Sequence, residues 1–234
     1  MITPRQIPLS LPHRAALDRA DFLVGAANAG AIALIDRWPD WPSRTVLLAG
    51  PVGSGKSHLV EIWRAASGAG VVAASDLAPA DADLLLAGGA VAIEDLHAGP
   101  LDEAALFHLL NLANERKAAV LMTSRVWPSA LPLTLPDLAS RLRAAQPVEL
   151  AEPDDDLLRR VLTKLFADRQ LIVDRSVIEF ILTRMERSLE AANLIVERLD
   201  KDALAEGRAI TQRFAAETLA SFFDGQTDFW PEED

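Results

Sequence analysis

The sequence contains no cysteine, so a disulfide framework is excluded. It also lacks long apolar runs: residues 25–35 and 84–93 are the longest uncharged apolar stretches, and they end at Asp36 and Glu94. A membrane-spanning helix needs roughly 18 to 20 such residues. The amino terminus has no basic start followed by an apolar stretch and a small-residue cleavage site, as a secretion signal would. We therefore expect a cytoplasmic protein without a transmembrane segment.

The chain has fewer positively than negatively charged residues. The chain has 23 Lys and Arg against 34 Asp and Glu, which gives a formal net charge of −11 at pH 7. The average field repels nucleic-acid phosphates and acidic membranes, so we expect DNA contact only through a partner and no membrane contact. Acidic residues concentrate in residues 224–234, which we expect to be a solvated tail, with docking through Phe229 and Trp230 as the alternative.

Apolar residues make up 50% of the chain, enough for one large core or two modest ones. Through about residue 150, short β-type runs alternate with helical stretches, which predicts a parallel sheet covered by helices, the α/β class. The apolar segment between Asp83 and Glu94 is typical of a strand buried on both faces. Strands are expected at residues 45–49, 71–73, 90–93, 118–122 and 147–150.

After residue 151 the pattern becomes helical, which predicts a small bundle. Pro153 suits the first turn of a helix, and the acidic residues Asp154, Asp155 and Asp156 suit its positive end. Apolar residues at helical spacing predict further helices near Asp174, after Ser188 and after Thr211. The expected organisation is an amino-terminal peptide over 1–15, an α/β domain over 16–151, a helical lid over 152–222 and a tail over 223–234.

The most informative segment is G-P-V-G-S-G-K-S, which matches the P-loop pattern between a predicted strand and a predicted helix. Glycines at 50, 53 and 55 let the backbone turn so that successive N–H groups face one point, where a phosphate binds. Lys56 supplies a positive charge for the terminal phosphates, and Ser57 can place its hydroxyl on Mg²⁺. The predicted loop comprises Gly50, Pro51, Val52, Gly53, Ser54, Gly55, Lys56 and Ser57.

A P-loop needs an acidic partner at the end of a neighbouring strand, and V-A-I-E-D supplies one. We expect Glu94 to be the Mg²⁺-side carboxylate and Asp95 to position or activate the attacking water. Thr123 and Ser124 end another strand, where they would either sense the terminal phosphate or serve as ordinary turn residues. The four histidines are too scattered for a metal site, and we expect His97 to be structural.

Four motifs together carry a family resemblance. G-S-G-K-S-H-L, V-A-I-E-D, V-L-M-T-S-R and D-L-A-S-R-L occur in this order, at residues 53–59, 91–95, 120–125 and 137–142. Over residues 6–219 the chain resembles the AAA+ ATPase module of the DnaA initiator family, and within it the short regulators of the Hda type, which inactivate the initiator. The resemblance implies an AAA+ P-loop fold with a helical lid that binds ADP or ATP with Mg²⁺.

The resemblance also implies roles for residues outside the P-loop. Val24 and Gly25 match the segment that lies over the adenine, and His58 extends the P-loop match. Arg141 matches an arginine finger that reaches the nucleotide of a neighbouring subunit. Arg187 matches the lid arginine that contacts phosphates. A guanidinium suits both sites because it neutralises charge spread over phosphoryl oxygens.

The opening peptide Q-I-P-L-S-L-P, residues 6–12, alternates apolar and other side chains with period two. This pattern fits either a first strand or a peptide that docks into another protein. In Hda-type proteins such a peptide binds the sliding clamp of the replicative polymerase. The residues that match this clamp peptide are Gln6, Ile7, Leu9 and Leu11.

The functional hypothesis is a regulator that binds the clamp and stimulates ATP hydrolysis on the DnaA initiator through Arg141. Glu94 stands where the initiator has aspartate, which implies slow intrinsic hydrolysis. No counterpart of the initiator's helix-turn-helix domain follows the bundle, so sequence-specific DNA binding is not expected. The alternatives are a nucleotide-switched clamp adaptor, a helicase-loader-type ATPase and a small-molecule phosphotransferase, and the sequence leaves open whether the chain forms a homodimer.

Overall fold

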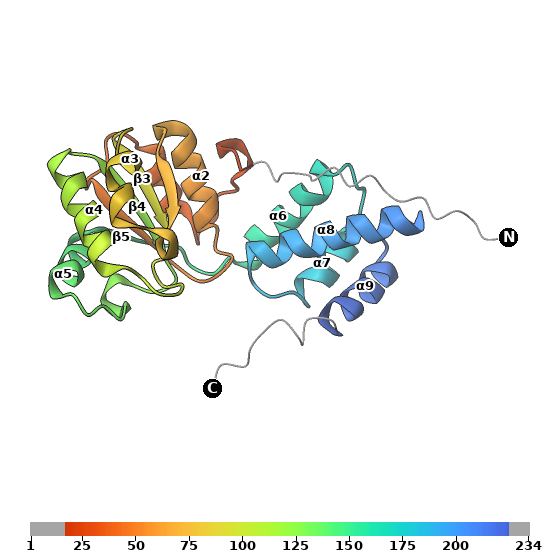
Figure 1. Cartoon of the computed structure of the whole chain (residues 1–234). Helices are drawn as coiled ribbons and strands as arrows, with labels where there is room; N and C mark the ends of the chain where they lie inside the picture. Colours follow the sequence, from red (N-terminus) through yellow and green to blue (C-terminus); the bar gives the residue numbers. More distant parts are fainter. Residues whose placement is uncertain (1–16, 225–234) are drawn as a thin grey trace. The chain divides into compact units, whose positions relative to one another are not determined.

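The computed structural model describes residues 17–224, with side chains described up to residue 220. The chain divides into two compact units between Pro153 and Asp154 (Figure 1). The predicted clamp-binding residues Gln6, Ile7, Leu9 and Leu11, and the tail residues Phe229 and Trp230, lie outside the described part of the chain.

The first unit contains a five-stranded parallel sheet with the strand order β2-β3-β4-β1-β5. The predicted α/β class is therefore confirmed. In the register, Ala49 at the end of β1 lies opposite Ser124 of β4 and Glu149 of β5, so the carboxyl ends of these strands share one edge. The strands are β1 Thr45–Ala49, β2 Gly70–Ala73, β3 Ala90–Glu94, β4 Ala119–Ser124 and β5 Gln146–Glu149.

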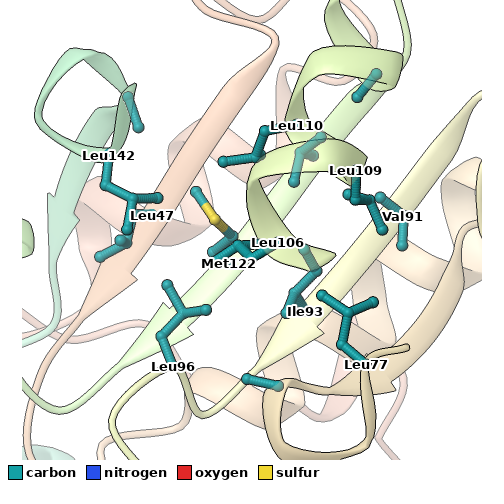
Figure 2. Close-up of a cluster of buried hydrophobic side chains, with 14 of the residues drawn as sticks. Leu47, Leu77, Val91, Ile93, Leu96, Leu106, Leu109, Leu110, Met122 and Leu142 are labelled. Atoms are coloured by element: carbon teal, nitrogen blue, oxygen red, sulfur yellow. The ribbon is translucent and has the colours of Figure 1, made fainter. Parts of the chain in front are cut away.

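Helices cover both faces of this sheet, and Figure 1 shows the central strands between α2 and α4. The strands contribute alternate residues to two cores, because successive side chains point to opposite faces. Leu47 packs with α4 and α5, as Figure 2 shows, whereas Val46 and Leu48 pack with α1 and α2. The helices are α1 Ala29–Asp36, α2 Lys56–Ser67, α3 Ala82–Leu85, α4 Glu103–Glu115 and α5 Pro136–Ala144, with short 3₁₀ turns at Arg19–Asp21, Ala74–Asp76, Pro79–Asp81 and Pro128–Ala130.

The strand predicted at residues 90–93 is confirmed as β3, but the first half of the apolar segment between Asp83 and Glu94 does not belong to a strand. Leu84 belongs to the short helix α3 and is 77% exposed, and β3 begins only at Ala90. Gly89 adopts a left-handed φ of 75°, which turns the chain before the strand starts. Apolar content alone did not distinguish this helical turn from a strand, whereas the paired glycines at 88 and 89 mark the break.

The second unit is a helical bundle in which side chains cap the amino termini of α6 and α8. The Asp154 carboxylate accepts a hydrogen bond from the Leu157 amide at 2.8 Å, so Asp154 caps α6. Pro153 therefore precedes the helix instead of occupying its first turn, which corrects the prediction. The Ser188 hydroxyl caps α8 in the same way, at 2.9 Å from the Ala191 amide. The helices are α6 Asp155–Asp168, α7 Arg175–Leu182, α8 Leu189–Glu206 and α9 Gln212–Asp224.

The bundle core consists of apolar side chains from all four helices, and its largest fully buried members are Phe166 and Phe214. Met185, which follows the end of α7, also belongs to this core and is 8% exposed. Within residues 17–224, no helix combines the length and the hydropathy that a bilayer-spanning segment needs.

Candidate nucleotide-binding site

Loops that leave three neighbouring strands are bonded to one another at the carboxyl edge of the sheet. The Gly50 amide, after β1, donates to the Ser124 carbonyl at 3.1 Å. The Asp95 amide, after β3, donates to the Thr123 hydroxyl at 2.9 Å, and the Leu96 amide donates to the Thr123 carbonyl at 3.0 Å. The predicted P-loop, acidic motif and β4 terminus therefore meet at one place.

The P-loop glycines serve two different purposes. Gly53 and Gly55 have φ values of 66° and 99°, a left-handed conformation that favours glycine. Gly50 has no such φ, but a Cβ there would lie 2.2 Å from the Leu150 carbonyl oxygen. The predicted turning role thus applies to Gly53 and Gly55, whereas Gly50 is required because β5 approaches closely.

Lys56 is the first residue of α2 and is only 7% exposed. Its ammonium donates to the carbonyls of Gly50 at 2.8 Å and Pro51 at 2.6 Å, and to the Ser54 hydroxyl at 3.4 Å. The charge is thus held inside the loop, next to the positive end of α2. A helix amino terminus with a lysine in this position fits a phosphate group.

Ser57 and Glu94 form the side of the site that suits a divalent cation. Burial raises the pKa of the Glu94 carboxyl, a hydrogen bond with the Ser57 side chain opposes this, and the charges of Asp95 and Glu61 add to the rise. Glu94 Oε1 is buried and has no hydrogen-bond partner among the described residues. A carboxylate oxygen beside a hydroxyl fits Mg²⁺, which binds through few protein oxygens and takes its other ligands from phosphates and water.

Few protein side chains are available as ligands for a cation at this place. Within residues 17–224 the structure contains no group of three or more His, Cys, Asp or Glu side chains that could hold a metal ion. A cation held by Ser57 and Glu94 would therefore depend on a bound phosphate for further ligands.

Thr123 and Ser124, at the end of β4, are fully buried. The Thr123 hydroxyl fixes the backbone of Asp95, which is exposed and has a left-handed φ of 59°. The Ser124 hydroxyl accepts from the Val126 amide at 3.1 Å. Both hydroxyls thus have a structural role in the loops, and sensing of a phosphate by these residues stays a prediction.

The segment that contains Val24 and Gly25 is fastened by Asn28, which the sequence reasoning missed. Asn28 is 2% exposed, accepts from the Gly25 amide at 2.9 Å and donates to the Leu23 carbonyl at 3.0 Å. Just before this segment, the Phe22 ring packs edge-on against the His58 ring, with centroids 5.1 Å apart. Val24 and Gly25 are therefore tethered near the start of α2. The available signal was an asparagine directly before an apolar helical run.

His97 is the second residue whose position the sequence reasoning missed. Its Nδ1 accepts from the Arg125 amide at 3.1 Å, and its Nε2 is buried without a partner among the described residues. Burial lowers the pKa of the imidazole, the charges of Arg125 and Lys56 lower it further, and Asp95 opposes them. The sequence did indicate that His97 lies near the site, because it follows Glu94 by three residues in the loop after β3.

A cavity of about 520 Å³ opens at the same edge of the sheet. Gly50 and Pro51 of the P-loop, Arg125 and Trp127 after β4, and Glu149 at the end of β5 contribute to its wall. Arg125 and the P-loop therefore border one hollow.

Arg141 lies on the exposed side of α5, and its guanidinium is 5.3 Å from the centroid of the Phe107 ring on α4. This distance allows a cation–π interaction that restrains the side chain. The carboxylate of Glu103, at the start of α4, accepts from the amides of Thr134 at 2.8 Å and Leu135 at 2.6 Å. Glu103 thereby fixes the segment immediately before α5.

Arg187, the predicted lid arginine, belongs to the helical unit. It lies directly before the cap residue Ser188 and pairs with Asp155 of α6 at 2.9 Å. Both side chains are more than half exposed. The pair is an exposed ion pair of the kind that contributes little to stability, so other contacts can replace it at low cost.

Comparison with known proteins agrees with this geometry. Residues 154–219 match the family model described as Hda, lid domain. Domain III of the Thermotoga maritima replication initiation protein DnaA has a TM-score of 0.73 and 17% identity, and the match covers 88% of this chain and 96% of that one. AMPPCP-bound DnaA from Aquifex aeolicus has a TM-score of 0.61 and 20% identity, with 75% and 62% covered.

A Holliday junction branch migration motor has the same fold. This protein, RuvB of Thermotoga maritima, has a TM-score of 0.65 and 18% identity, with 83% of this chain and 66% of that one covered. At these identities the likeness shows the fold alone, and the lid match concerns residues 154–219. The chain thus has the fold of DnaA domain III, with a P-loop α/β unit followed by a helical unit that matches the Hda lid domain over residues 154–219.

Proposed function

We propose that this replication-initiation-related AAA+ protein is a cytoplasmic regulator that binds ADP or ATP with Mg²⁺ and stimulates ATP hydrolysis on the DnaA initiator. The observation that carries the proposal is the Hda lid match over residues 154–219 in a chain with a complete P-loop. DnaA structures of the same fold bind AMPPCP, an ATP analogue, which supports an adenine nucleotide as the ligand.

The nucleotide's phosphates would bind at the start of α2. Lys56 would exchange its bonds to the Gly50 and Pro51 carbonyls for bonds to phosphoryl oxygens, which accept charge-assisted hydrogen bonds. Ser57 and Glu94 would hold Mg²⁺, which supplies charge neutralisation at the phosphates. Asp95, fixed by Thr123, would orient water. The longer side chain of Glu94 would make intrinsic hydrolysis slow.

Arg141 would act on a second protein. It is exposed, and Phe107 restrains its guanidinium, which suits a group presented to ATP bound on DnaA. The active centre would be composite, with the phosphate loop and acidic residues on the initiator and the arginine on this chain. An arginine finger of this kind raises turnover by about 10³ to 10⁵ fold.

The experiment compares Arg141→Ala with Arg143→Ala, an exposed arginine on the same helix. Phosphate release from ATP-loaded DnaA is measured with each protein, and MgADP binding is measured by calorimetry. Arg141→Ala should lose at least tenfold in stimulation while retaining MgADP affinity, and Arg143→Ala should retain both. Equal stimulation by wild type and Arg141→Ala would reject the arginine's role.

We further propose that Gln6, Ile7, Leu9 and Leu11 tether the protein to the sliding clamp. Deletion of residues 1–12 should abolish capture of the purified clamp without changing MgADP affinity. If wild type binds the clamp and nucleotide but never stimulates DnaA, the protein is a clamp adaptor instead. Clamp binding that survives the deletion would exclude this peptide as the tether.

A further inference from the structure

The proposed nucleotide chemistry gives no role to His97, although its ring is fixed more firmly than that of a surface histidine. The loop that contains it turns through a bond from the Ala98 amide to the Asp95 carbonyl, at 2.9 Å. Leu96 is bonded to Thr123, and Nδ1 of His97 accepts from the Arg125 amide at 3.1 Å. Contacts on both sides of the residue therefore hold the ring against the end of β4.

These contacts determine the tautomer. Because Nδ1 accepts a backbone N–H, a neutral imidazole must carry its proton on Nε2. Burial and the nearby cations Arg125 and Lys56 favour the neutral ring. Nε2–H is therefore a buried donor that has no acceptor among the described residues. A buried donor in a native protein requires an explanation, because nearly all such groups are paired.

The ring lies beside the phosphate end of the site. Arg125, which holds the ring, directly follows Ser124, whose carbonyl accepts from the Gly50 amide of the P-loop. Arg125 also borders the 520 Å³ cavity together with Gly50 and Pro51. The Lys56 ammonium is close enough for its charge to act on the imidazole. An oxygen-rich anion at the P-loop would thus lie near the loop that carries the donor without an acceptor.

We infer that His97 donates its Nε2–H to an oxygen of the terminal phosphoryl group, so that it distinguishes a nucleoside triphosphate from a diphosphate. The inference rests on the proposed nucleotide binding and names the residue that reads the γ-phosphate. It places this role on the loop after β3, and the hydroxyls of Thr123 and Ser124, which accept from backbone amides, keep their own O–H donors.

The test measures the affinities for MgADP and Mg-AMPPCP by calorimetry. His97→Asn keeps a carbonyl oxygen near the Nδ1 position, where it can accept from the Arg125 amide, but removes the distal donor. Its affinity for Mg-AMPPCP should fall about tenfold or more, the usual effect of losing a hydrogen bond to a charged group, while MgADP affinity stays within about twofold. His108→Asn, an exposed site on α4, should change neither affinity.

A second variant covers the case in which His97→Asn does not fold. His97→Gln places an amide N–H near the Nε2 position and should retain more of the preference for the triphosphate than His97→Asn. In the wild type, the ¹⁵Nε2 resonance of His97 should shift on addition of Mg-AMPPCP and not of MgADP. Equal weakening of both nucleotides, or an unchanged resonance, would overturn the role of His97. Failure of the wild type to bind either nucleotide would instead overturn the proposed function, and this inference with it.

Discussion

Substitution of Gly50 by alanine tests the packing of the P-loop against β5. An added Cβ would lie 2.2 Å from the Leu150 carbonyl oxygen and 3.0 Å from the Leu150 Cβ. The oxygen belongs to the backbone, so rotation of a side chain cannot relieve the clash. The Leu150 amide donates to Ala49 at 2.7 Å, which ties the obstructing residue to the end of β1.

The size of the effect follows from these distances. An ordinary contact needs more than 3 Å, so the two segments must separate by about 1 Å, which weakens the bond between Leu150 and Ala49. A buried backbone hydrogen bond lost in this way costs about 1–3 kcal/mol, and overpacking costs about 1–3 kcal/mol. We expect the α/β unit to lose about 2–5 kcal/mol, a fall in Tm of roughly 10 °C.

Tryptophan fluorescence during thermal unfolding measures this change. Trp41 and Trp63 stack with centroids 5.0 Å apart, and Trp38 meets both edge-on, all within the α/β unit. The control is Gly30→Ala on α1, because a Cβ at Gly30 meets no atom within 4 Å. The control should melt at or slightly above the wild-type temperature, because alanine favours helix over glycine. If the Gly50→Ala protein had the same melting temperature as the Gly30→Ala control, the reasoning would be refuted.

Three further predictions concern other elements. Hydrogen bonds from Thr134 lower the pKa of the Glu103 carboxyl in the folded protein. The ionised carboxylate therefore stabilises the fold at pH values above its unfolded pKa of about 4.3, and this stabilisation is lost as the pH falls through its lower folded pKa. Glu103→Gln should therefore lower the urea midpoint at pH 7 and flatten its acid dependence, and parallel pH curves would contradict this. Ser188→Ala removes the cap of α8 and should cost about 1 kcal/mol, seen as faster amide exchange in its first turn. Phe166→Ala should destabilise the bundle by about 3–5 kcal/mol, measured by exchange of core amides in α8.

The sequence predicted the features that have local signals. The strand at Thr45–Ala49 is apolar throughout, and the left-handed turns at Gly53 and Gly55 require glycine, so pattern and residue type agreed with the structure. The cap of α8 was likewise visible as Ser188, whereas Asp154, which caps α6, was expected inside the first turn of that helix. The displaced Pro153 reflects the uncertainty of a helix end by one or two residues.

Contacts between distant residues carried no such signal. The bond between Arg125 and His97 joins residues 28 positions apart, and the clash that requires Gly50 involves Leu150. Both depend on strand order, because β3 lies beside β4 and β1 lies beside β5 only in the folded sheet. The roles of Arg141, Arg187 and the amino-terminal peptide came from the family resemblance and stay predictions.

The alternation of core residues along β1 affects which changes in chain length the protein can accept. Val46 and Leu48 serve one core while Leu47 serves the other, so inserting or deleting a single residue within this strand would exchange the layers that its side chains fill. The sheet therefore tolerates conservative replacements far better than insertions or deletions within its strands. Variation in length between relatives should be confined to the connecting segments.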